Sequence, residues 1–208
     1  MLMQGRAGLV RTGDGSDVVA RLGQQGEVMV SELHGRYYEQ AARGKMAFAI
    51  SLDRAMSLFS ATAQIGLIVH NPVDSGVNLS LNKWAIQNTV TDADMVGVAL
   101  CMGYQTTTPT TITAANSSGL VYVTQPTLTA GKAKAYAIAT VLIAPVMVWP
   151  LVHVTAAIAT TGVDAVFGDL EGAFVVPPGG FATMSTIAAA GPTAGMTSAL
   201  MWEEVPVL

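Results

Sequence analysis

Short apolar runs separated by turn-forming residues make up most of the chain from residue 45 onward. The clearest run is VNLSLNKWAIQN at 77–88, where Val77, Leu79 and Leu81 alternate with polar residues. An apolar period of two is typical of a half-buried strand. The preceding NPVDSG, at 71–76, is made largely of turn formers. The pattern therefore predicts a turn that leads into a strand.

Similar strands are expected along the rest of the chain. They cover residues 45–52, 55–63, 66–70, 77–88, 95–104, 110–116, 119–125, two segments within 135–158, the two runs flanking PPGG, and 195–205. The 55–63 segment is also compatible with a helix. Many short strands with turn signals between them, and no alternating helices, indicate an all-β sandwich or barrel.

The sharpest turn signal is PPGG at 177–180, which separates the apolar runs 174–176 and 181–186. Proline presets φ for the first corner of a turn, and glycine accepts the positive φ of the second corner. We therefore predict a hairpin here.

The stretch 135–163 contains no formally charged residue. Its length would allow a membrane-spanning helix, but Pro145 and Pro150 interrupt it and large residues alternate with small ones. We interpret it as two buried strands joined near the prolines, and we expect no membrane contact.

Charged residues are few and unevenly distributed. They make up 12% of the chain, against about 25% in ordinary soluble domains, while 51% of residues are hydrophobic. Residues 1–54 hold 7 of the 10 basic side chains. We predict an extended N-terminal arm at 1–44, with a brief helix possible at 31–42, and a β domain at 45–208. The acidic remainder argues against nucleic-acid binding.

A β domain with so few charged residues would expose wide apolar areas as a monomer, so we expect a homo-oligomer. Small residues at 188–194 would allow subunits to approach closely. In the arm, four residues are the predicted partner interface because they combine aromatic anchors with charge. They are Arg36, Tyr37, Tyr38 and Arg43.

The candidates for chemistry are isolated from one another. His34, His70 and His153 are far apart, and Cys101 lies in an apolar run where a buried thiol is expected. Two acidic pairs have alternative interpretations. Asp92 and Asp94 could belong to a solvated turn or bind a hard cation. Asp169 and Glu171 could form a charged strand edge or act as the paired acids of a glycosidase. We expect no enzyme activity, no metal and no cofactor.

Three stretches together resemble virion structural proteins of tailed bacteriophages. They are SELHGRYYEQAARGKMAF at 31–48, GLIVHNPVDSGVNLSLNK at 66–83, and the C-terminal pair DLEGAFVVPPGGFATMST (169–186) and ALMWEEVPV (199–207). The resemblance implies a jelly-roll-like antiparallel β-sandwich that acts as a capsid cement or decoration protein. It implies that the protein is made in the host cytoplasm, binds the major capsid protein at the virion surface and forms a homotrimer.

A rival interpretation is a head-fibre or tail-associated module that binds a host glycan. Such a module needs an exposed aromatic platform. Trp84, Trp149 and Trp202 all lie in apolar, strand-like stretches, which disfavours this interpretation.

Overall fold

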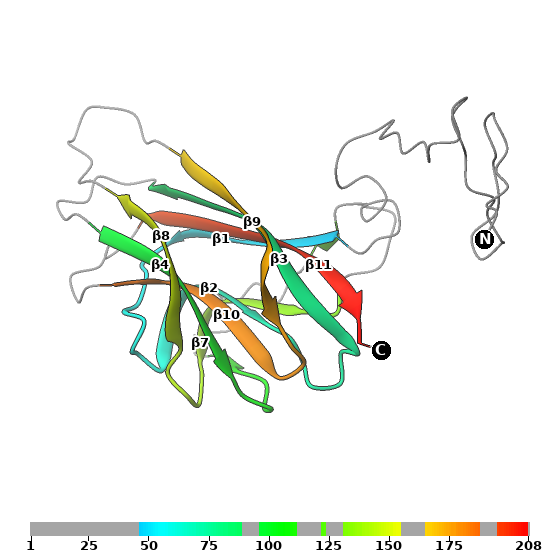
Figure 1. Ribbon diagram of the computed structural model, residues 1–208. Helices are drawn as coiled ribbons and strands as arrows, with labels where there is room; N and C mark the ends of the chain where they lie inside the picture. Colours follow the sequence, from blue (N-terminus) through cyan, green and yellow to red (C-terminus); the bar gives the residue numbers. More distant parts are fainter. Residues whose placement is uncertain are drawn as a thin grey trace, which may run out of the picture. The chain divides into compact units, whose positions relative to one another are not determined.

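The computed structural model describes residues 46–88, 96–111, 122–123, 131–154, 165–187 and 195–207. These residues form strands and no helix, and the strands make two antiparallel sheets that face each other (Figure 1). The predicted all-β sandwich is therefore confirmed. The predicted arm at 1–44 and the small residues at 188–194 lie outside the described residues.

Each sheet is built from strands that are distant in sequence. The first sheet has the order β6 (Tyr122–Val123), β1 (Met46–Arg54), β11 (Met196–Pro206), β3 (Val77–Asn88) and β9 (Ala165–Val176). The second has the order β5 (Thr110–Thr111), β7 (Lys134–Thr140), β2 (Ala63–His70), β10 (Gly180–Thr186), β4 (Val96–Tyr104) and β8 (Val146–Val154).

The order of the strands is that of a jelly roll. Without the two-residue strands β5 and β6 and the added strand β7, eight strands remain, four in each sheet. Numbered one to eight along the chain, they stand in the order 1-8-3-6 in the first sheet and 2-7-4-5 in the second. The first strand pairs with the last, and all but one of the connections cross between the sheets. Two Greek keys wound in this way define the jelly-roll architecture.

The PPGG turn does not form the predicted hairpin. β9 pairs with β3 in the first sheet, whereas β10 pairs with β2 and β4 in the second. The predicted turn chemistry is nevertheless present: the N–H of Gly180 donates to the carbonyl of Pro177 (2.8 Å), and Gly179 has a φ of 83°. This is a type II turn, with Pro178 and Gly179 at its corners. The turn takes the chain from the first sheet to the second. Val176 before it and Ala182 after it both point into the core between the two sheets.

Residues 55–62 form a loop, so the strand predicted at 55–63 is wrong. Only an isolated bridge between Leu58 and Thr186 remains of it. The Ser57 hydroxyl donates to the Ala63 carbonyl (3.1 Å) and accepts the N–H of Ile65 (2.8 Å). These local bonds compete with strand pairing, and they fold the segment back on the start of β2.

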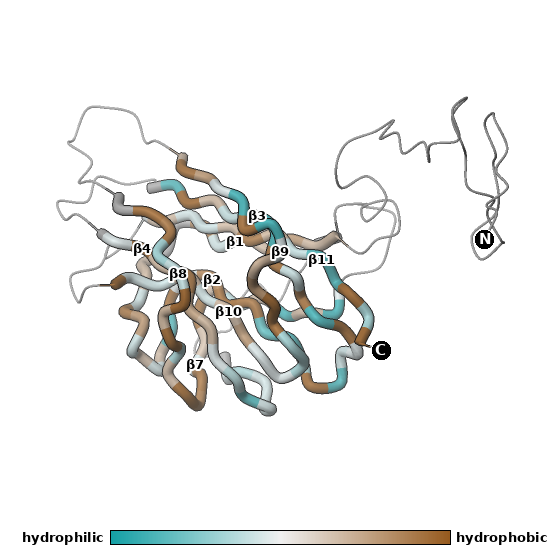
Figure 2. The backbone as a smooth tube through the Cα atoms, viewed as in Figure 1, coloured by the Kyte–Doolittle hydropathy of each residue, from teal (hydrophilic) through white to brown (hydrophobic). Residues whose placement is uncertain are grey.

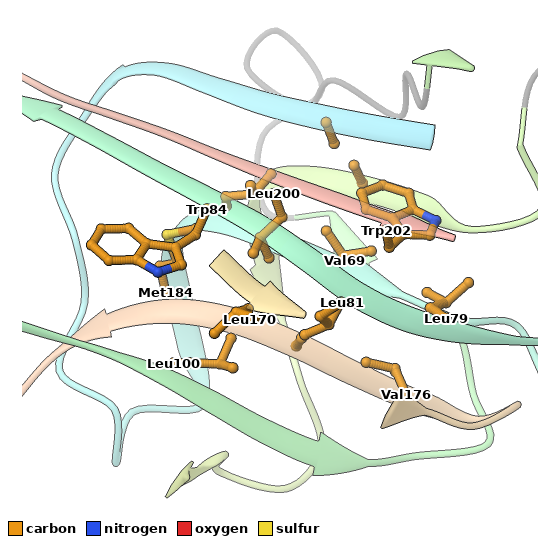
Figure 3. Close-up of a cluster of buried hydrophobic side chains, with 14 of the residues drawn as sticks. Val69, Leu79, Leu81, Trp84, Leu100, Leu170, Val176, Met184, Leu200 and Trp202 are labelled. Atoms are coloured by element: carbon orange, nitrogen blue, oxygen red, sulfur yellow. The ribbon is translucent and has the colours of Figure 1, made fainter. Parts of the chain in front are cut away.

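The hydrophobic core fills the space between the two sheets (Figure 3). Trp84 of β3 and Leu200 of β11 point into it from the first sheet, and Leu100 of β4 and Met184 of β10 from the second. The Trp84 indole crosses the neighbouring β9 so closely that a Cβ on Gly168 would lie 2.6 Å from its Nε1 atom. β9 can therefore pass the indole only because residue 168 has no side chain.

Asn71 joins the two sheets at one end of the sandwich. Its backbone N–H donates to the carbonyl of Gly180 (2.8 Å), and its carbonyl accepts the N–H of Gly179 (2.7 Å). Its side-chain Nδ2 donates to the carbonyls of Val77 (2.7 Å) and Val176 (3.0 Å). Asn71 is fully buried, so water has little access to these bonds, of which only the one to Val77 is partly exposed.

Replacing Asn71 with Asp should destabilise the fold, because a carboxylate cannot donate to the carbonyls of Val77 and Val176. We expect a loss of about 3 kcal/mol in the free energy of unfolding at pH 7. The loss should shrink near pH 4, where a protonated Asp can donate one hydrogen bond. Urea denaturation of variant and wild type at both pH values measures this difference.

The matched control is Asn78→Asp, on the half-buried outward side of β3, which should change stability little. If Asn71→Asp is as stable as the wild type at pH 7, the Asn71 side chain does not hold the sheets together.

Candidate functional site

Among the described residues, the side chains with catalytic potential are not gathered into one site. In the part of the chain that the structure describes, no three His, Cys, Asp or Glu side chains come together as metal ligands. His34, Asp92 and Asp94 lie outside the described residues, and the side chain of His153 is likewise not described.

His70 is a buried structural histidine. Its Nε2 atom lies 3.5 Å from the carbonyl of Gln105, and its Nδ1 atom is buried without a hydrogen-bond partner. Burial lowers the pKa of His70, and the positive charge of Lys134, its pairing partner on β7, lowers it further, against an opposing effect of the Gln105 hydrogen bond. The imidazole is therefore held neutral.

Cys101 is buried in β4, as the sequence indicated. Burial raises the pKa of its thiol to about 11, against a smaller opposing effect of a hydrogen bond with Ser185. A thiol that stays protonated at neutral pH is a poor nucleophile and a poor metal ligand.

Asp169 and Glu171 lie on β9, at the edge of the first sheet, where both are exposed. Asp169 forms an ion pair of 3.1 Å with Lys83 of β3. This arrangement is that of a charged strand edge, the first of the two interpretations given to the pair.

The uncharged stretch that begins at residue 135 forms two strands, as predicted, but only one of them is buried. β7 is buried, whereas residues 146–150 of β8 are all exposed. β8 stands at the end of its sheet and pairs only with β4 among the described strands, so its side chains have no neighbour on one side. No helix among the described residues is long and apolar enough to cross a membrane.

The exposed part of β8 and the turn before it form an apolar ridge. The ridge consists of six large side chains with exposed fractions between 38% and 69%: Leu142, Ile143, Val146, Met147, Val148 and Trp149. Its tip, the turn between β7 and β8, is strongly hydrophobic in Figure 2. The Trp149 ring lies 6.0 Å from the ring of Phe174 on β9, so the ridge reaches the edge of the other sheet.

β8 is poorly suited to pair with an additional strand. Pro150 lacks an N–H, and the pairing with β4 shifts register twice, at Val98/Ala99 and at Leu100/Cys101. Prolines and bulges are the devices by which natural sheets block their edges. The ridge therefore offers side chains to a partner, and not a backbone template.

A second apolar feature is a hollow of about 300 Å³ on the outward face of the first sheet. Ala199 and Ala85 sit in register between Ile50 on β1 and Phe167 on β9. The two small residues leave a depression between larger neighbours, which include Phe48, Met201 and the Lys83–Asp169 ion pair. Phe167 is 81% exposed.

The partner interface predicted from the sequence, at Arg36, Tyr37, Tyr38 and Arg43, lies outside the described residues and stays a prediction. The ridge and the hollow were not predicted. The ridge has a local signal, the uncharged run LIAPVMVW, whereas the hollow depends on register across four strands.

No protein-family model, curated protein or solved structure matches the chain. The order of the strands is therefore the basis on which the fold is assigned.

The buried, neutral His70 predicts that stability falls as the pH drops below about 6.5, the ordinary pKa of the imidazole in the unfolded chain. Between that value and the lower pKa of the folded state, the unfolded chain binds the proton more tightly, so protonation favours unfolding. His70→Gln should remove this contribution, because its amide can still donate to the Gln105 carbonyl but does not titrate.

Urea midpoints between pH 5 and pH 8 for both proteins provide the measurement. Because both proteins contain all the other titrating groups, the difference between their pH dependences isolates the contribution of His70. An identical pH dependence in the two proteins would contradict the assignment.

Proposed function

We propose that this protein is a non-enzymatic structural protein of a bacteriophage virion. In this proposal it is a capsid cement or decoration protein, bound to the shell of major capsid protein and to other copies of itself. The main support for this proposal is the exposed apolar surface of the protein, which is found in the ridge and in the hollow. Exposed apolar patches of this kind mark interaction sites, among which protein–protein contacts are one class. The jelly-roll strand order, an architecture found in viral capsid proteins, supports the proposal.

The state of the candidate catalytic groups supports a non-enzymatic role. Nucleophilic catalysis needs an activated nucleophile beside a base, with access to substrate. Cys101 is buried with a raised pKa, His70 is buried, and Asp169 is paired with Lys83.

The surroundings of Trp149 favour a protein partner over a glycan. Trp84 and Trp202 are buried in the core, so Trp149 is the one tryptophan that could stack on a sugar. Its neighbours in the ridge are aliphatic, as at Leu142 and Val146, and cannot bond the sugar hydroxyls.

If the protein is a cement protein, mass spectrometry of purified virions should find it in numbers close to those of the major capsid protein. A few copies per particle would instead indicate a fibre or a portal-side part. Absence from the particles would overturn the proposed function.

Deletion of residues 1–44 should leave a folded β domain that no longer binds capsids, because we propose that the arm, with Arg36, Tyr37, Tyr38 and Arg43, grips the shell. Co-sedimentation with purified shells measures binding, and circular dichroism checks the fold. The control is deletion of residues 1–30, which lie outside the resemblance and should be dispensable. A folded protein that lacks 1–44 and still binds shells would contradict the role of the arm.

A further inference from the structure

We propose that the apolar ridge, residues 142–149, is the surface through which copies of this chain contact one another around a closed symmetry axis. This inference names the partner at one of the two surfaces. It rests on the proposed function only for the number of copies, which we take as three.

The ridge is large enough to be a subunit contact. Its six residues together expose roughly 600 Å², distributed over both faces of the edge strand, because Val146 pairs with Met102 and Met147 with Cys101 on the opposite face. Tyr104, which is 53% exposed, extends it at one end, because it lies two residues beyond Met102, the partner of Val146. A stable interface buries about 800 Å² on each partner, so the ridge can supply most of one where the contact encloses both faces of the β8 edge.

The absence of charge favours a second copy as the partner. Identical groups of the copies meet close to a symmetry axis, so a self-contact must avoid like charges there. Residues 140–154 contain no Asp, Glu, Lys or Arg. If β9, the other long edge strand, lay close to such an axis, Asp169 and Glu171 would meet their own copies.

The blocked edge of β8 determines the kind of contact. Strand addition at an open edge can continue without limit, whereas side-chain packing around an axis closes at a fixed number of copies. Pro150 and the two register shifts hinder strand addition. Trp149, supported by the Phe174 ring, provides a rigid aromatic anchor of the kind that dominates interfaces.

Light scattering on the full chain in the absence of capsids tests the inference. The wild type should have the mass of three chains of 21.5 kDa each. The double variant Leu142→Glu/Val146→Glu should have the mass of one chain. Both side chains are more than 60% exposed, so the monomer should stay folded. The matched control, Leu52→Glu, changes a residue that is 62% exposed on β1 of the other sheet and should leave the trimer intact.

Cross-linking provides a second measurement that does not depend on disrupting the contact. Val146→Cys should be joined to a second chain by a short bis-maleimide, and Leu52→Cys should not. Cys101 does not interfere, because it is buried and its thiol has a pKa raised to about 11.

A monomeric wild type, or a double variant that keeps the wild-type mass, would overturn the inference. A double variant of wild-type mass that no longer binds shells would assign the ridge to the capsid. A wild-type dimer that the double variant dissociates would support the ridge contact and contradict the three-fold count. These results do not depend on whether virions contain the protein, so the proposed function can fail separately.

Discussion

The buried amide of Asn71 is the constraint on which this end of the molecule depends. It donates to the carbonyls of Val77, the first residue of β3, and Val176, the last residue of β9. It thereby connects the start of β3 to the PPGG turn, through which the chain leaves the first sheet. Through Gly179 and Gly180, its backbone holds the same turn from the side of the second sheet. The two sheets cannot separate here without leaving buried polar groups unpaired, which is costly.

The same hydrogen bonds extend to the apolar ridge. The carbonyl of Gly179, fixed by the turn, accepts the N–H of Gln105 at 2.7 Å. The side-chain oxygen of Gln105 accepts the N–H of Leu142, at the tip of the ridge, at 2.8 Å. The ridge is thus attached to the inter-sheet turn by a short, continuous path, and is positioned before any partner binds. Such preorganisation reduces the entropy lost on association.

The ridge and the hollow belong to different sheets. The ridge follows β8 at the edge of the second sheet, and the hollow lies over β1, β11, β3 and β9 on the outward face of the first. A protein with two separate apolar surfaces can contact two partners at once. That property suits a subunit that we propose to bind both its own copies and a shell.

The features that arise from neighbouring residues could be inferred from the amino-acid sequence. The alternation at Leu79 and Leu81, the proline and glycine of the PPGG turn and the apolar run around Cys101 act locally. The strand, the presence of a turn and the burial of the thiol could therefore be predicted from them. The charged edge at Asp169 was also recognisable, because charge on a strand is tolerated mainly where solvent reaches it.

Which strands are neighbours became known from the folded structure. The runs on either side of PPGG join different sheets, and β8, which contains no Asp, Glu, Lys or Arg, lies at an edge and not in the centre. Ala85 and Ala199 form a hollow only because register places them side by side. Pairing partners, edge positions and register result from contacts between residues far apart in the chain, and a local pattern of hydrophobic residues does not specify them.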